Sequence, residues 1–296
     1  MKRRHITRRL SLALVGMVTL LLTACAGQFE PRGGYVVDHR HQASSHNSRI
    51  RHLVIHYTSS DEAVSLRALT GPSVSSHYLV PLPPRQLRGD PLVYQLVDES
   101  RRAWHAGASA WKQRTNINDT SIGIEIVNLG PLGTREEIPG DQLQVWASYP
   151  PRQIDAVIAL AGDIVERYDI HPTNVVAHSD IAPTRKVDPG PRFPWQQLYE
   201  AGIGAWPQAD TIERYHQRFT AQPPTLDEFQ RALKAYGYPI ETSGEYDRQT
   251  HAVLRAFQLH FRPADYRGLP DAESAAILWS LLERYHPELL PIRESR

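Results

Sequence analysis

The chain has 296 residues, 41% of them hydrophobic and 22% charged, which is ordinary for a globular protein and enough for two domains. Its formal net charge is +1, but five basic side chains lie among the first ten residues, and subtracting them leaves −4 for the rest. A mildly acidic chain has no electrostatic footprint for nucleic acid, so we expect no nucleic-acid partner.

Residues 1–24 are predicted to be a signal peptide. A basic start precedes the apolar run 10–22, which is too short to span a bilayer comfortably. The sequence Leu-Thr-Ala-Cys at 22–25 resembles the lipobox of bacterial lipoproteins, and Cys25 is the only cysteine in the chain. The resemblance implies that a lipid on Cys25 anchors the chain to a membrane. Ala26, rather than aspartate, follows the cysteine, which favours the periplasmic face of the bacterial outer membrane.

Residues 25–48 are polar and lack apolar periodicity, so we expect a tether. Residues 50–58 alternate as in a strand that ends near His56, and 75–80 and 92–97 are further candidate strands.

Residues 121–128 alternate strictly and place Glu125 on an otherwise apolar strand, which is costly unless the carboxyl group has a task. Apolar residues at helical spacing follow over 151–168, behind a proline suited to a first turn.

The stretch 175–195 brings three reactive side chains close together in the sequence. A short apolar strand at 175–177 ends at His178, and Lys186 and Asp188 lead into a stiff Pro-Gly-Pro turn. Strands and helices in this order predict an α/β domain over 49–202, with a central mixed β-sheet flanked by helices.

The C-terminal part is predicted to form a separate small domain. Prolines at 207, 223 and 224 indicate a linker over 203–223. Three amphipathic segments within 224–288, the first opening on a capping box at Thr225, predict a small three-helix bundle. His251 and His260 lie on these helices without a matching carboxylate pattern, and we expect surface or packing roles for them.

Five residues at strand ends or in unusual surroundings suggest a metal-assisted amide hydrolase. His56, His178 and Asp188 form a plausible zinc set that leaves a fourth position open, as catalysis requires. Glu125 could accept a proton from water and deliver it to the leaving amine, while Lys186 could stabilise the oxyanion. The spacing alone matches no short metal motif such as HExxH.

Several motifs resemble the zinc-dependent N-acetylmuramoyl-L-alanine amidases related to peptidoglycan recognition proteins. They are LVIHYT, SSHYLV, AWHAG, SIGIEIVN and AHSDIAPTRKVDPGPRFPW, in the family's order over roughly 48–200. By position, the resemblance implies one Zn²⁺ per chain on His56, His178 and Asp188. It also implies a proton shuttle at Glu125 and transition-state assistance from Lys186.

The same resemblance bears on several further residues. His105 in AWHAG is implied to contact substrate, and Trp104 beside it to pack. Asn128 matches a position near the site, with a strand-end hydrogen bond as the alternative, and His77 is either a pocket residue or a buried structural histidine. The segment DRQTHAVLRAFQ resembles a peptidoglycan-binding domain, although the altered FRPADYRGLP that follows leaves a pure packing role open.

The resemblance implies hydrolysis of the amide between N-acetylmuramic acid, or its anhydro form, and L-alanine in peptidoglycan or muropeptides during cell-wall turnover. We expect a monomer. Two alternatives stay open: a peptidoglycan-binding protein without catalysis, and a zinc peptidase acting on cell-wall peptides. Because all three ligand positions and both assisting positions are filled, the enzyme is favoured.

Overall fold

The computed structural model describes residues 28–133 and 145–293, and the side chains up to residue 290. The predicted signal peptide and Cys25 lie outside these residues. The chain divides into two compact units, Met1–Ser48 and Arg49–Arg296. No helix among the described residues combines the length and apolar character needed to cross a membrane.

The first unit contains a small hairpin where the sequence predicts only a tether. Strands β1 (Phe29–Arg32) and β2 (Tyr35–Asp38) pair antiparallel. Gly33 and Gly34 form the two-residue turn between them, and Gly34 has a positive φ of +93°, which glycine adopts without steric cost. The tether prediction therefore missed a local turn signal.

The second unit is built on a five-stranded mixed sheet, which confirms the predicted fold class. The strand order is β11 (Val175–Ala177), β3 (His52–Tyr57), β10 (Ser121–Ile126), β4 (Tyr78–Val80) and β7 (Tyr94–Gln95). The first four strands are parallel, and β7 pairs antiparallel with β4. Both faces of the sheet are covered, so β3 and β10 are buried almost throughout.

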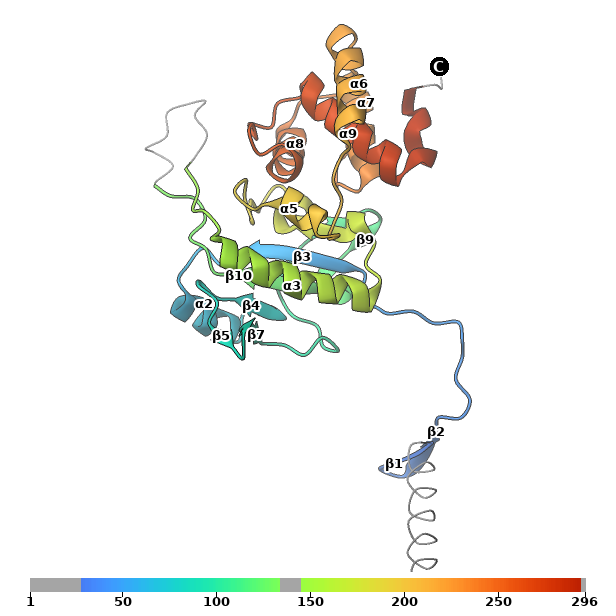
Figure 1. Ribbon diagram of the computed structural model, residues 1–296. Helices are drawn as coiled ribbons and strands as arrows, with labels where there is room; N and C mark the ends of the chain where they lie inside the picture. Colours follow the sequence, from blue (N-terminus) through green and yellow to red (C-terminus); the bar gives the residue numbers. More distant parts are fainter. Residues whose placement is uncertain (1–27, 134–144, 294–296) are drawn as a thin grey trace, which may run out of the picture. The chain divides into compact units, whose positions relative to one another are not determined.

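Helix α3 (Pro151–Tyr168) covers one face of the sheet (Figure 1). Its buried Ile154 and Val157 share a core with Leu53 and Ile55 of β3. Val54, between those two strand residues, belongs instead to the core on the other face. His56 has the parity of Val54, so its side chain projects from the face opposite α3.

Short elements complete the α/β part. Helix α2 (Glu62–Leu69) is capped by Asp61, whose carboxylate accepts the Val64 N–H at 2.8 Å. The others are β5 (Gln86–Leu87), β6 (Asp90–Pro91), β8 (Ala110–Trp111), β9 (Arg114–Thr115), η1 (Ile117–Thr120), η3 (Pro172–Asn174), α4 (His178–Ile181) and α5 (Trp195–Glu200).

The three predicted C-terminal helices are α7 (Leu226–Tyr236), α8 (Arg248–Phe261) and α9 (Ala272–Tyr285), followed by η4 (Pro287–Arg293). The linker prediction was wrong for Ala209–Ala221, which form α6. Tyr215 and Phe219 of α6 are buried, and the Phe219 ring meets the Trp279 ring of α9 at 5.1 Å between centroids. Prolines on both sides concealed a helix that tertiary packing stabilises.

The C-terminal helices join the α/β part through the buried Asp180 of α4. One carboxylate oxygen accepts the Tyr238 hydroxyl at 2.7 Å, and the other accepts the Ala177 N–H and lies 2.7 Å from His260 Nδ1. The His260 ring also stacks on Trp195, with 3.8 Å between centroids. His260 is therefore an inter-element hydrogen-bonding partner, which the expectation of a surface or packing role did not include.

Candidate active site

Parallel pairing of three strands assembles the site. Glu125 of β10 lies in register with His56 of β3. On the other side of β3, Ala177 of β11 is in register with Ile55, so His178 directly follows the strand beside His56. Because parallel strands end at the same edge of a sheet, residues far apart in sequence converge there.

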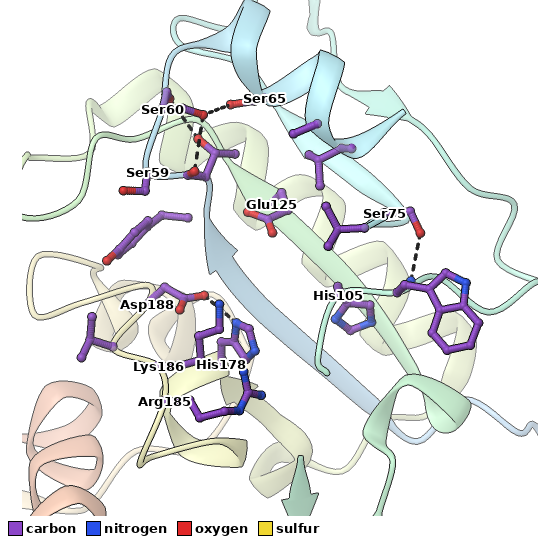
Figure 2. A pocket seen from close by; sticks show the side chains of 17 residues that line it. Ser59, Ser60, Ser65, Ser75, His105, Glu125, His178, Arg185, Lys186 and Asp188 are labelled. Carbon is purple, nitrogen blue, oxygen red and sulfur yellow. Dashed lines mark hydrogen bonds and ion pairs between the residues drawn. The ribbon is translucent and has the colours of Figure 1, made fainter. Parts of the chain in front are cut away.

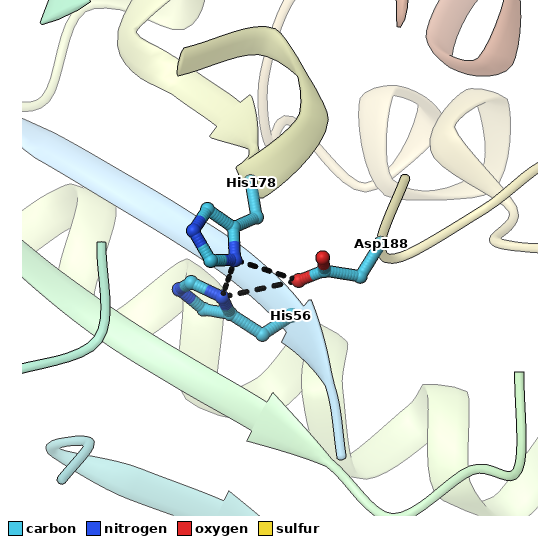
Figure 3. A group of neighbouring side chains, drawn as sticks. All are labelled: His56, His178 and Asp188. Atoms are coloured by element: carbon cyan, nitrogen blue, oxygen red, sulfur yellow. Dashed lines mark hydrogen bonds and ion pairs between the residues drawn. The ribbon is translucent and has the colours of Figure 1, made fainter. Parts of the chain in front are cut away.

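Two histidines and one aspartate converge on a single point (Figure 3). The Nδ1 atoms of His56 and His178 are 2.9 Å apart, and Asp188 Oδ2 lies 3.2 Å from the first and 2.9 Å from the second. Zinc bonds of about 2.0–2.1 Å in a tetrahedral site place neighbouring ligand atoms roughly 3.3 Å apart. The spacing therefore fits one zinc ion. Within the described part of the chain, this is the one cluster of such side chains able to hold a metal.

A chain of hydrogen bonds orients the His56 ring. The Ser121 hydroxyl donates to Ile117 O at 2.7 Å, so it is free to accept from His105 Nε2 at 3.1 Å. His105 Nδ1 then accepts from His56 Nε2 at 2.9 Å. With its proton on Nε2, His56 presents the Nδ1 lone pair toward the metal position.

The His178 ring is oriented by the same principle. Its Nε2 lies 3.2 Å from the carbonyl oxygen of Ala106, which can only accept, so Nε2 carries the proton. Both imidazoles therefore direct unprotonated Nδ1 atoms at the point that Asp188 also faces. This arrangement of lone pairs is the form in which a metal is bound.

The electrostatics of the trio agree with that assignment. Burial, reinforced by the nearby His178, lowers the pKa of His56 to about 4, so the ring is neutral near pH 7. Burial raises the pKa of Asp188, but the adjacent His178 and His56 rings outweigh it and hold that pKa below its usual range. A neutral His56 imidazole beside an ionised carboxylate suits a divalent cation.

Glu125 is an unpartnered carboxyl group beside this trio. Its Oε2 is buried and has no hydrogen-bond partner. Burial and the charge of Asp188 raise its pKa well above the usual value, and Lys186 opposes that rise. A half-buried carboxyl group with one fully buried, unpartnered oxygen is costly, which points to a functional role such as proton transfer.

A pocket of about 400 Å³ opens in front of these residues (Figure 2). His105, Glu125, His178, Lys186 and Asp188 all line it. His56, the third member of the trio, does not line the pocket, and only 1% of its surface is exposed.

The sequence interpretation of Trp104 was wrong. The residue is 53% exposed and lines the pocket, and the Arg102 guanidinium lies 4.1 Å from the centroid of its ring. Arg185 was missed altogether, although it also lines the pocket and donates to the carbonyl oxygens of Ala106 and Ala108. An exposed aromatic and an ordinary arginine carry no signal in a single sequence.

Two of the remaining residues considered in the sequence, Asn128 and His77, have structural hydrogen bonds and do not line the pocket. Asn128 lies outside the pocket lining, because its amide donates to Ser148 O at 3.0 Å and accepts the Gly130 N–H at 2.7 Å. This is the strand-end alternative rather than a substrate contact. His77 is fully buried, accepts the Gly123 N–H and bonds Arg101 O, which makes it a structural histidine.

A mixed α/β sheet that brings two histidines, an aspartate and a half-buried glutamate to one edge defines a candidate metal-dependent hydrolase. Comparison with known proteins narrows the class. Residues 46–191 match the N-acetylmuramoyl-L-alanine amidase family, and residues 222–275 match a peptidoglycan binding domain family.

One relative is the N-acetylmuramoyl-L-alanine amidase AmiD of Escherichia coli (strain K12). It is 48% identical over 269 residues, which cover 90% of this chain and 95% of AmiD. The chain belongs to the N-acetylmuramoyl-L-alanine amidase family.

Two solved structures share this architecture. The complex of E. coli AmiD with anhydro-N-acetylmuramic acid-L-Ala-D-gamma-Glu-L-Lys has a TM-score of 0.78 and 46% identity, covering 88% of this chain and 98% of that one. AMPDH3 of Pseudomonas aeruginosa with anhydromuramic pentapeptide has a TM-score of 0.75 and 42% identity, covering 86% and 98%.

Proposed function

We propose that this chain is a zinc-dependent amidase that hydrolyses the bond between N-acetylmuramic acid, or its anhydro form, and L-alanine in muropeptides and peptidoglycan. The observation that carries the proposal is the convergence of two Nδ1 lone pairs and the Asp188 carboxylate beside an unpartnered Glu125. The anhydromuramoyl peptides bound by AmiD and AMPDH3 support this class of substrate.

The residues of the pocket have separable tasks. Zinc held by His56, His178 and Asp188 would supply Lewis-acid chemistry to the scissile carbonyl. Glu125, with its raised pKa, takes the proton of the attacking water and transfers it to the departing L-alanine nitrogen. Lys186 lines the same pocket and stabilises negative charge on the carbonyl oxygen.

Two variants test the division of labour. We expect Glu125→Gln to keep one zinc per chain and to lower kcat by about 10²–10⁴-fold, because only the proton transfer is lost. Asp188→Ala should lose both zinc and turnover, because a ligand is removed. Zinc content by mass spectrometry and peptide release from purified peptidoglycan measure both quantities.

The products distinguish the proposal from its alternatives. An amidase releases peptides with a free L-alanine amine, whereas a peptidase releases fragments cut within the stem or cross-link. Full activity of Glu125→Gln would refute its assigned role. A metal-free wild-type protein that binds peptidoglycan and releases nothing would refute the enzyme.

We further infer that Cys25 is acylated and holds the protein on the periplasmic face of the outer membrane. Support comes from the sequence Leu-Thr-Ala-Cys behind a basic and apolar leader. Labelling cells with an acyl-chain probe should mark the wild type and not Cys25→Ser, and the wild type should fractionate with outer membranes. A labelled Cys25→Ser protein would contradict this assignment.

A further inference from the structure

A second cavity, of about 760 Å³, lies at the other end of strand β3 from the zinc site. Arg51 and His52, at the start of β3, line this cavity, whereas Tyr57 and Thr58, at the end of the strand, line the active-site pocket. Four residues at about 3.3 Å each separate His52 from His56, so the two openings lie on opposite ends of the sheet. The arrowhead of β3 in Figure 1 marks the zinc end.

The lining of this cavity is basic. It contains Arg51, Lys112, Arg114 and Lys234, and no carboxylate. Burial, together with the charges of Lys112, Arg114 and Arg51, lowers the pKa of His52 to about 4. Three cations therefore act on one buried, neutral imidazole, and a positive field persists at this end of the sheet.

These cations are not neutralised by neighbouring acids. Among the described residues, no ion pair involves any of the four, and the Lys112 ammonium donates instead to the Thr173 hydroxyl at 2.8 Å. Glu288 does not line the cavity and lies 3.5 Å from Nδ1 of His286, which does. A basic surface without acids is suited to phosphate groups.

The chain itself connects this end to the N-terminal segment. The second unit begins at Arg49, two residues before Arg51 of the cavity. The ten residues 39–48 link the second unit to the β1–β2 hairpin, and they span at most about 33–36 Å when fully extended. A lipid on Cys25 would thus keep the basic end at high local concentration near the bilayer.

We propose that the face formed by Arg51, Lys112, Arg114 and Lys234 docks on anionic phospholipid headgroups. The inference rests on the proposed lipid anchor. Leu289, which is 37% exposed, offers an apolar contact at the same opening. Docking through this end directs the zinc pocket, at the opposite end of β3, away from the membrane and toward the cell wall.

Vesicle binding tests the proposal without the anchor. A chain that starts at Ala26 keeps the β1–β2 hairpin and the second unit, and lacks Cys25. We expect it to sediment with vesicles of equal parts phosphatidylcholine and phosphatidylglycerol, and not with phosphatidylcholine alone. Each cation removed should weaken binding about fivefold, so Lys112→Gln/Arg114→Gln/Lys234→Gln should bind roughly a hundredfold less tightly.

A matched control neutralises three exposed arginines that line neither cavity: Arg88→Gln/Arg152→Gln/Arg218→Gln. If the position of the cations, rather than the net charge of the protein, determines vesicle affinity, this control should bind vesicles about as tightly as wild type. Equal losses in both triple variants, or equal binding to neutral vesicles, would overturn the proposal. So would a Lys112/Arg114/Lys234 variant that keeps vesicle binding and loses binding to purified peptidoglycan, since that assigns the face to stem-peptide carboxylates.

Hydrolysis of a soluble muropeptide separates this proposal from the proposed amidase function. The Lys112/Arg114/Lys234 variant should cleave it at the wild-type rate. An inactive wild type that still binds anionic vesicles would contradict the amidase and leave the docking face in place.

Discussion

At the level of single residues, His105 contributes to the site by orienting the His56 ring, in addition to any contact with substrate. Its ring bonds His56 Nε2 at 2.9 Å and is held in turn by Ser121. It also lines the pocket, so the predicted substrate contact stays a prediction. The structure adds a positioning role that the AWHAG motif does not reveal.

We expect His105→Ala to weaken zinc affinity by about 10–100-fold, because the His56 ring loses the partner that fixes its protonated nitrogen. Competition with a zinc chelator measures this directly. His251→Ala is the control, since His251 lies on α8 outside the zinc pocket. Unchanged zinc affinity in His105→Ala, with only KM raised, would show that the ring serves substrate and not the ligand.

Gly123 makes room for that ring. A Cβ atom at this position would lie 2.6 Å from the His105 ring, which is closer than real contacts allow. We expect Gly123→Ala to lower the free energy of unfolding by about 1–3 kcal/mol through overpacking, and to weaken zinc binding with it. Urea unfolding and chelator competition measure the two effects.

Gly162 of α3 provides the opposite case. A Cβ there would meet only Ile203 Cδ1, at an ordinary 3.7 Å. Gly162→Ala should therefore stabilise the fold by about 0.5–1 kcal/mol, as expected for alanine in a helix. Similar effects of the two substitutions would contradict the steric argument at Gly123.

Some features of the site can be predicted from the sequence and others cannot. His56, His178 and Asp188 could be assigned from the sequence because motif and strand-end position agree. The proton order through His105 and Ser121 could not, because it depends on side-chain contacts across β10 and β3. Sequence patterns specify which face a side chain takes, but not its partner on that face.

At the scale of elements, Glu99 ties a loop to the C-terminal end of α3. Its carboxylate accepts Arg167 Nη2 at 2.9 Å and the hydroxyls of Tyr168 and Tyr78 at 2.7 and 2.8 Å. The Arg167 hydrogen bonds, and those of both tyrosines, lower the pKa of Glu99 to about 2 although burial opposes them. The ionised form is thus favoured by folding.

We expect Glu99→Gln to reduce the free energy of unfolding by about 1–2 kcal/mol at pH 7, with allowance for solvent screening of the Arg167 pair. A carboxyl group with a lowered pKa contributes stability above its unfolded pKa of 4.5, and that contribution disappears as pH falls toward about 2. The difference between wild type and variant should therefore shrink over that range in denaturant titrations. A difference that stays constant down to the folded pKa would contradict the linkage, and Glu166→Gln on the exposed face of α3 is the control.

The elements also show where periodicity suffices. Helix α3 runs over the predicted residues 151–168, because its apolar spacing and first-turn proline are unambiguous. Helix α6 was missed because its three buried residues, spaced four apart, sit among charged side chains and between prolines. Its burial comes from α9, which lies far away in the sequence.

At the scale of the whole second unit, the catalytic and C-terminal parts share one apolar core. Val54 and Val176 of the sheet belong to the same cluster as Phe229 and Leu278 of the C-terminal helices. Polar contacts through Asp180 cross the same boundary. The C-terminal helices therefore stabilise the α/β part through this shared core, and this role does not depend on whether the helices bind glycan.

The Asp180 contacts predict cooperative unfolding of residues 49–296. Tyr238→Phe and His260→Phe each remove one donor to a buried carboxylate while keeping a ring in place, and each should cost about 1–3 kcal/mol. Because α4 begins at the proposed zinc ligand His178, two residues before Asp180, both variants should also weaken zinc binding. Calorimetry of the wild type should show one transition for this unit, and separate transitions for its two parts would contradict the shared core. Tyr246→Phe, whose hydroxyl bonds only within the C-terminal part at Gly268 O, should leave zinc affinity unchanged.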